Sequence, residues 1–371
     1  MVFPQVNSPR NARKIAIIIC AIAITGIFSF SAATSDSATS TPVKQLEELF
    51  GVPYRNGEFR LPTKLYRNVS IRDIDSDVVI NIVSADELHP ATFEKLNIRN
   101  SNNLRLSNIN FSADISGSYT DFIVSDSKNV IFEKIRASSQ MPLISTRSAG
   151  LLITSSDGVQ VLNSYFENLS YGIRIQYSLA IAINGNSFRE IRSDGVQVKG
   201  TSDIAIVGNA FTDFRPSPGD HSDAIQFFTA GTAKSAQDIE IRNNLITRGD
   251  GDAVQGIFLA GEATLPYRNV AISNNLVIGT LYNGIFVEPG ATGIVTKNTV
   301  IGLPDQKSWL YSLPSSELQI SANVATFFTS PIRNSSVPAG NRQINVPKDN
   351  GAAIFSSWSQ KNASTTNGTS E

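Results

Sequence analysis

The sequence predicts an all-β solenoid, a fold in which short strands repeat in stacked coils. Three near-identical tetrapeptides begin at Asp194, Asp223 and Asp252, each 29 residues after the one before it. A second series places an asparagine after each run of alternating strand residues. The composition agrees, because only 17% of the residues are charged while Asn, Ser, Ile and Val are abundant.

The asparagine series gives the length of the repeat. Its members are spaced by 23, 23, 35, 31 and 23 residues, so the basic coil has about 23 residues: Asn163, Asn186, Asn209, Asn244, Asn275 and Asn298. Asn tolerates the left-handed backbone of a sharp corner, and stacked Asn side chains can hydrogen-bond to one another and to the main chain. We therefore expect one corner of every coil to hold an asparagine ladder.

This coil, with Asn at one corner, resembles the right-handed parallel β-helix of the pectate-lyase-like superfamily over about residues 61–330. Relatives with this fold include polysaccharide lyases, mannuronan C5-epimerases, polygalacturonase-type hydrolases and phage depolymerases, so the resemblance implies carbohydrate handling. It does not select one reaction. Asp220-His221 is similar to part of the Asp-Pro-His phrase of the epimerases but lacks the Pro, and no complete family signature is present.

Residues 1–33 have the pattern of a signal peptide. Basic residues precede an apolar run over 15–30, and Ser31-Ala32-Ala33 offers small residues for cleavage. An uncleaved anchor is the alternative, because the run is nearly long enough to span a bilayer. Cleavage would remove the single cysteine, Cys20, and would give a secreted or periplasmic protein without disulfides.

The charge balance excludes a polybasic nucleic-acid binder, since the net charge is −1. We expect a polysaccharide as partner, no membrane contact after signal cleavage, and a monomer.

Both ends of a solenoid need covering, because the end coils would expose the core. Residues 34–60 are expected to form a linker and an N-terminal capping helix, and residues 331–371 a C-terminal cap followed by a disordered tail from Lys361. The C-terminal cover would be Ile344–Trp358. The apolar face of the capping helix would consist of Val43, Leu46, Leu49 and Phe50.

The longer coils place their extra residues around one strand position. The loop 215–222 precedes the strand that begins at Asp223, and further extra residues fall within 228–237 and 259–268. Insertions on one side of a solenoid often form its binding face. The residues that start the strands of this face are predicted to be Tyr171, Asp194, Asp223, Asp252 and Asn283.

Alternation along these strands predicts which side chains point outward. Arg174 and Lys199 would hold a substrate carboxylate, and Phe228 would lie beside them. The glutamines Gln197, Gln226 and Gln255 would contact sugar hydroxyls, or form a purely structural ladder. The side chains expected to point inward are Ile173, Ile175, Val196, Val198, Ile225, Phe227, Ile285 and Val287.

His221 is one of two histidines and lies in the inserted loop between Asp220 and Asp223. Its imidazole suits proton transfer near neutral pH. Asp194, Asp223 and Asp252 would stack about 5 Å apart, so one must hold a proton or a cation such as Ca²⁺ must lie between them. Alternatively, these carboxylates only make turns.

We therefore predict an exported enzyme that acts on an acidic polysaccharide by β-elimination or C5-epimerisation. His221 would transfer the proton, and the other catalytic candidates are Asp223, Asp252, Asp194 and Asp220. One alternative is a glycoside hydrolase that uses paired Asp residues. Another is a non-catalytic polysaccharide-binding or surface structural protein.

Overall fold

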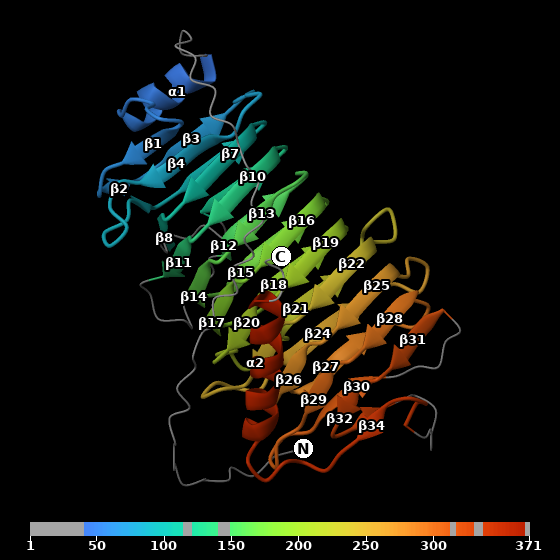
Figure 1. Ribbon diagram of the computed structural model, residues 1–371. Helices are drawn as coiled ribbons and strands as arrows, with labels where there is room; N and C mark the ends of the chain where they lie inside the picture. The colour runs from blue at the N-terminus through green and yellow to red at the C-terminus, as the bar shows by residue number, and fades with distance from the viewer. Residues whose placement is uncertain (1–40, 114–120, 140–148, 312–316, 330–336, 368–371) are drawn as a thin grey trace.

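The computed structural model describes residues 41–113, 121–139, 149–311, 317–329 and 337–367. They form a β-solenoid in which three long sheets, here called A, B and C, run along the molecule (Figure 1). Each coil contributes one strand to each sheet, and neighbouring strands pair in parallel. The predicted all-β coil architecture is confirmed.

The strands are grouped here by sheet. Sheet A contains β1 (Glu58–Leu61), β4 (Ile80–Ser84), β7 (Asn102–Ser107), β10 (Lys128–Glu133), β13 (Gln160–Leu162), β16 (Leu179–Asn184), β19 (Ser202–Val207), β22 (Gln237–Arg242), β25 (Arg268–Ser273), β28 (Gly293–Thr296) and β31 (Leu318–Ser321). Sheet B contains β2 (Leu65–Tyr66), β5 (Thr92–Phe93), β8 (Asn110–Ala113), β11 (Arg136–Ser139), β14 (Tyr165–Leu169), β17 (Ser187–Ile191), β20 (Ala210–Thr212), β23 (Leu245–Thr247), β26 (Leu276–Ile278), β29 (Thr299–Ile301), β32 (Val324–Ala325) and β34 (Arg342–Gln343). Sheet C contains β3 (Val69–Arg72), β6 (Leu96–Arg99), β9 (Phe122–Ser125), β12 (Ala149–Thr154), β15 (Tyr171–Gln176), β18 (Val196–Lys199), β21 (Asp223–Phe228), β24 (Gln255–Ala260), β27 (Tyr282–Val287), β30 (Ser308–Tyr311) and β33 (Phe328–Thr329).

The corner between sheets A and B holds the predicted asparagine ladder. Each amide Nδ2 donates to the Oδ1 of the next rung at 2.9–3.0 Å, along Asn186, Asn209, Asn244, Asn275, Asn298, Asn323 and Asn341. The left-handed backbone conformation belongs to the residue before each rung, such as Gly208 or Asn243. Asn163 was wrongly placed in the ladder, because it takes this left-handed position and Ser164 lies in the rung.

The interior is apolar, as the alternation predicts. The eight side chains expected to face inward are each 0–4% exposed. Phe166, Phe188 and Phe211 stack through the core with ring centroids 5.0 and 4.7 Å apart. Gly195 lies against this stack, where a Cβ would approach Phe211 Cδ1 to 2.7 Å, so only glycine fits without a shift of the ring.

The N-terminal cap is confirmed. Helix α1 (Thr41–Phe50) buries Val43, Leu46 and Phe50 against the first coil, and the Phe50 ring lies 6.0 Å from Phe59. Leu49 points away and is 36% exposed.

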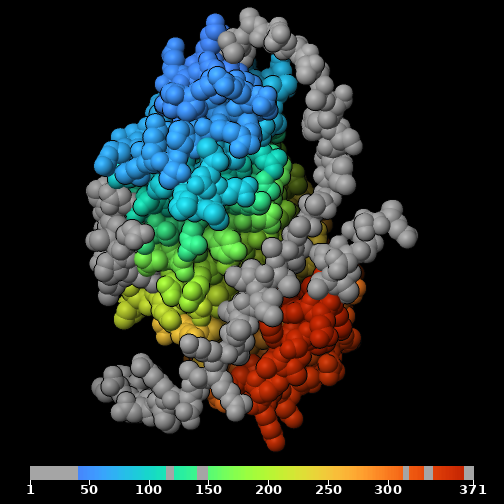
Figure 2. Space-filling model, turned by 60° about the vertical axis from the view of Figure 1, so that its left-hand side comes forward, coloured from blue at the N-terminus to red at the C-terminus, as the bar shows by residue number. Residues whose placement is uncertain are grey.

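The C-terminal helix α2 (Ala352–Asn367) does not cover the last coil as predicted. It lies along the outer face of sheet B (Figure 1), and Figure 2 shows the C-terminal residues gathered on one side of the molecule, away from the N-terminal cap. Its apolar side chains, Ile354, Phe355 and Trp358, pack against Leu276, Ile278, Ile301 and Leu303. The helix also extends through Lys361, where a disordered tail was expected. Outward apolar residues of sheet B explain both differences, because they require a cover.

Within the described ranges, no helix is long and apolar enough to cross a membrane. The predicted signal peptide lies outside these ranges.

Candidate functional site

The predicted insertions flank sheet C on both sides. The segment 213–222 leads into β21, whereas 229–236 and 261–267 leave β21 and β24. The two departing loops contact each other, since the backbone N–H of Glu262 donates to Thr229 Oγ1 at 2.8 Å. The outer face of β21 and its neighbours therefore lies between two sets of loops.

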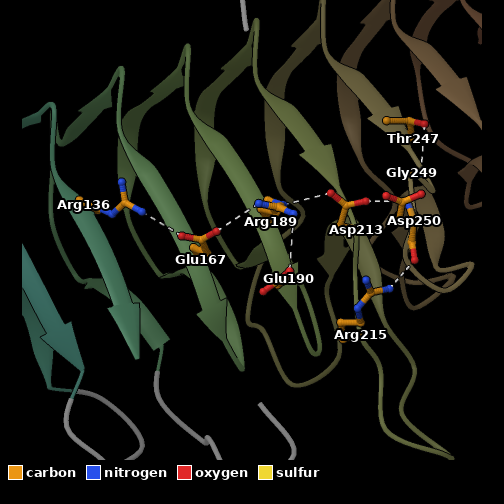
Figure 3. A network of polar contacts seen from close by, with 9 residues as sticks. All are labelled: Arg136, Glu167, Arg189, Glu190, Asp213, Arg215, Thr247, Gly249 and Asp250. Atoms are coloured by element: carbon orange, nitrogen blue, oxygen red, sulfur yellow. Dashed lines mark hydrogen bonds and ion pairs between the residues drawn. The ribbon is translucent and has the colours of Figure 1, made fainter. Parts of the chain in front are cut away.

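A charged network fixes the base of the loop that contains His221 (Figure 3). The buried Asp213 carboxylate accepts from Arg189 Nε at 3.1 Å and from the Asp250 backbone N–H at 2.7 Å. Arg215 Nη1 then donates to the Asp250 carbonyl at 2.6 Å. These contacts join three successive coils, and they assign Asp250 to a turn at the base of the loop.

Asp220 fixes the same loop near its tip. Its carboxylate pairs with Arg192 Nε at 2.9 Å and accepts from the Ser217 backbone N–H at 3.0 Å. The hydrogen bond from Arg192 holds the pKa of Asp220 below its ordinary value. Asp220 was predicted only as a catalytic candidate, and these partners indicate a positioning role for it.

His221 and Asp223 form the central pair of the site. His221 Nδ1 lies 3.0 Å from Asp223 Oδ2, and Gln226 Nε2 donates to the same oxygen at 2.9 Å. The imidazole is 56% exposed, while Asp223 is completely buried. Hydrogen bonding to Asp223 raises the pKa of His221. The other oxygen, Asp223 Oδ1, is buried and has no hydrogen-bond partner among the described residues. The hydrogen bonds that stabilise this carboxylate from side chains therefore both come to Oδ2, from His221 and Gln226.

Asp194 lies behind this pair, one coil earlier. Its Oδ1 accepts from the Asp223 backbone N–H at 3.0 Å, and its Oδ2 accepts from Gln197 Nε2 at 2.6 Å. Burial, followed by the charge of Asp223, raises the pKa of Asp194 to about 7. Both carboxylates therefore lie at the corner, as the turn alternative predicted, and only His221 reaches the surface from this group.

The predicted place of Asp252 is wrong. In the strand register Asp223 pairs with Gln255, and Gln226 pairs with Phe258. Asp252 is exposed three residues earlier, where its backbone N–H donates to the Phe214 carbonyl. The expected stack of three carboxylates does not form. The described residues contain no group of three or more His, Cys, Asp or Glu side chains that could hold a metal ion such as Ca²⁺.

A directional hydrogen-bond chain reaches His221 from the other side. Trp309 Nε1 donates to Asn283 Oδ1 at 3.0 Å, Asn283 Nδ2 donates to Gln255 Oε1 at 2.5 Å, and Gln255 Nε2 lies 2.6 Å from His221 Nε2. An indole N–H can only donate, so it orients both amides. Gln255 then donates to His221 Nε2, and the neutral imidazole keeps its proton on Nδ1 for Asp223.

We expect Trp309→Phe to loosen the hydrogen bond at His221 Nε2, while Asp223 still keeps the ring proton on Nδ1. Without the indole N–H both amides can turn over, and Gln255 no longer has to present its N–H to Nε2. The ¹⁵N shifts of the His221 ring measure this directly, because His89→Gln leaves a single histidine. The matched control is Trp358→Phe, which removes the N–H that donates to the Asn274 carbonyl at the corner between sheets A and B. An unchanged Nε2 shift in Trp309→Phe would contradict the assigned direction.

The outward side chains of sheet C form a second row, here called the face column. It consists of Arg174, Gln197, Gln226, Phe258, Phe286 and Tyr311. Arg174 Nε donates to Gln197 Oε1 at 3.1 Å, and Gln197 Nε2 donates to Gln226 Oε1 at 3.2 Å. Lys199 lies beside the column with its Nζ 5.5 Å from the Phe228 ring. Five of the six predicted binding residues thus share one face, whereas Gln255 lies at the corner beside His221.

Comparison with known proteins agrees with this architecture. The sequence matches the family model described as right handed beta helix region over residues 67–211 and 149–325. The chain belongs to the right-handed β-helix family. This β-helix resembles PfbA, a surface adhesin of Streptococcus pneumoniae, with a TM-score of 0.50 and 14% identity over 82% of this chain and 94% of that chain.

Two further solved β-helix structures are similar at lower scores. The alginate lyase from Paenibacillus sp. str. FPU-7 has a TM-score of 0.46 and 13% identity over 82% of this chain and 96% of that chain. The Dettilon tailspike protein has a TM-score of 0.48 and 14% identity over 77% of this chain and 61% of that chain. No curated protein matches the sequence significantly. At such identities the likeness concerns the fold alone.

Sequence reasoning missed three residues of this β-helix site. Phe258 occupies the outward position that was predicted for Gln255. Asn283 was predicted only as the first residue of its strand, and no role was predicted for Trp309. The inward spacing of Ile257 and Leu259 was the available signal for Phe258, because it sets which residues of β24 point outward.

Proposed function

We propose that this protein is an exported enzyme that binds an acidic polysaccharide on the face of sheet C and removes the proton next to a sugar carboxylate. The observation that supports it most is the His221–Asp223 pair, which lies at the corner beside the face that carries two cationic side chains. Lys199 is on the neighbouring strand and Arg174 on the strand beyond it. Adjacent strands are about 4.8 Å apart, so one sugar chain can reach all of these groups.

The proposed chemistry follows from which nitrogen of His221 is already hydrogen-bonded to Asp223. His221 Nδ1 is hydrogen-bonded to Asp223, so Nε2 is the basic atom. The substrate C–H takes the place of Gln255 at Nε2, and Asp223 stabilises the imidazolium that forms. Lys199 and Arg174 stabilise the negative charge that develops on the sugar carboxylate. In an elimination the bond to the neighbouring glycosidic oxygen then breaks, and this oxygen leaves with the proton that the imidazolium returns. In an epimerisation a proton from solvent is delivered to the opposite face, and the imidazolium gives its own proton up to solvent.

The geometry does not favour the hydrolase alternative. A glycosidase needs two carboxyl groups on either side of the scissile bond. Asp194 and Asp223 are 1% and 0% exposed, and Asp252 lies outside the site. Binding without catalysis is the second candidate, because Gln255 already hydrogen-bonds to the basic nitrogen of His221.

A substrate panel tests the proposal. The mature protein is incubated with uronate polysaccharides while ultraviolet absorbance of unsaturated uronates, reducing ends and hydrogen exchange at C5 are followed. We expect unsaturated ends, or C5 exchange without cleavage. Reducing ends without absorbance would indicate a hydrolase, and binding with none of these changes would indicate a binding protein; either result overturns the proposal.

The pH dependence gives a further prediction. His221 acts as a base only when neutral, so kcat/KM rises as the pH passes upward through its pKa. Because Asp223 raises this pKa, we expect Asp223→Asn to move the acidic limb to lower pH, together with a lower maximum. Initial rates across the pH range measure the shift. If the acidic limb of the kcat/KM profile stays at the same pH in Asp223→Asn, His221 is not the titrating base.

A further inference from the structure

The face column changes its chemistry at the strand that contains Asp223. Before and at this strand it consists of Arg174, Gln197 and Gln226, whereas after it the column is aromatic. The ring centroids of Phe258 and Phe286 are 4.9 Å apart, and those of Phe286 and Tyr311 are 4.7 Å apart. His221 lies at the boundary, with its ring 5.3 Å from Phe258.

These rings are not needed for the core. The inward neighbours in the same strands, among them Ile257, Ile285 and Leu310, are 0–1% exposed and fill the interior. Phe258, Phe286 and Tyr311 point outward and remain half-buried. On sheet B a comparable outward apolar strip is covered by α2, but neither of the two helices in the described residues packs over this aromatic row. The row therefore leaves partly exposed aromatic surface for a ligand.

Charge determines which sugar suits this aromatic row. Glu288 directly follows β27 and points outward by the alternation of that strand. The pKa of Tyr311 is raised first by burial of its side chain and second by the negative charge of Glu288. Lys307 lies near the same end, but its Nζ is directed over the Phe327 ring at 5.6 Å. A negative group thus accompanies the aromatic half, whereas Arg174 and Lys199 accompany the polar half. A carboxylated sugar is attracted to the polar half and repelled from the aromatic half.

We propose that Phe258, Phe286 and Tyr311 form a subsite for an uncharged sugar, so that the ligand is a mixed polysaccharide in which an acidic unit is followed by a neutral one. The C–H groups of a neutral sugar pack against the exposed part of the aromatic row, while the acidic unit lies over the polar half. The inference that the reacting bond lies beside His221, between the polar and the aromatic half, rests on the proposed function. The inference of a neutral-sugar subsite does not depend on it.

Calorimetric titration with neutral hexasaccharides of glucose, mannose and galactose tests the subsite. We expect at least one to bind, and Phe286→Ala to weaken this binding at least about fivefold, because the central ring of the aromatic row is lost. The control Tyr165→Ala removes an exposed aromatic ring on sheet B and should leave affinity unchanged. Thermal melting confirms that both variants are folded.

Two further arms complete the experiment. Glu288→Gln should tighten the binding of uronate hexasaccharides, because the repelling charge is removed. His221→Gln should keep neutral binding while it abolishes turnover. If no neutral hexasaccharide binds, or if Phe286→Ala binds it as well as the wild type, the subsite is rejected. If neutral binding depends on Phe286 but no polysaccharide is turned over, the subsite stands and the proposed enzymatic function falls.

Discussion

His221→Gln is expected to lower the turnover of a susceptible polysaccharide by a factor of about 10²–10⁴, the usual contribution of a positioned acid or base. The glutamine amide can still donate to Asp223, so the buried carboxylate keeps a partner and the fold is preserved. Initial rates of unsaturated-uronate formation or C5 exchange measure the loss, and calorimetry shows whether the sugar still binds.

The chain contains its own control for this substitution. His89 Nδ1 also lies 2.9 Å from a carboxylate, Asp86 Oδ2, but that pair is exposed in the turn between β4 and β5. We expect His89→Gln to retain wild-type rates. Full activity in His221→Gln would exclude the proposed base, and equal losses in both variants would point to a general effect on the protein.

Asn244→Ala is expected to cause the largest loss of stability. Asn244 is completely buried; its Oδ1 accepts from the backbone and side-chain N–H groups of Asn209, and its Nδ2 donates to the Ile206 carbonyl and to Asn275. Truncation leaves several buried polar groups unpaired, each at about 1–3 kcal/mol. We expect the free energy of unfolding to fall by about 3 kcal/mol or more, as measured by urea denaturation.

The last rung of the same ladder is the matched comparison. Asn341 is half-buried and accepts from Asn323 at 2.9 Å, so water can replace part of what Asn341→Ala removes. We expect a loss of about 1 kcal/mol there. Equal losses at the two rungs would mean that burial of the ladder does not determine its contribution.

The sequence was sufficient for features that arise within one coil. Alternation placed Val196 and Val198 in the core, and the asparagine spacing located the corner between sheets A and B. Both follow from local backbone geometry, which repeats in every coil. The same reasoning also located the insertions around β21, because their lengths can be counted directly.

Register across an irregular coil could not be predicted in this way. The tetrapeptide at Asp252 repeats the one at Asp223, yet Gln255 is the residue that pairs with Asp223. The intervening turn takes up extra residues because Asp213 binds the Asp250 N–H and the Phe214 carbonyl accepts from Asp252. Such contacts between coils determine the strand register, and near-identical tetrapeptides in the sequence do not reveal these contacts.

The hydrogen-bond chain that orients His221 could not be predicted either, because it also depends on contacts between coils. Gln255, Asn283 and Trp309 come from three successive strands of sheet C, and no local pattern joins them. Helix α2 is a similar case, since its Ser, Thr and Asn residues favour disorder by composition. Its order comes from Phe355 and Trp358, which find an apolar strip that different coils supply.

Helix α2 also alters how the solenoid can come apart. In a simple stack each coil holds only its neighbours, so fraying proceeds one coil at a time from an open end. By packing against Leu276 and Ile301 on β26 and β29, α2 acts as a strap across two coils. We expect these two coils to melt together, so that unravelling from the C-terminal end is halted before it reaches the strands beside His221.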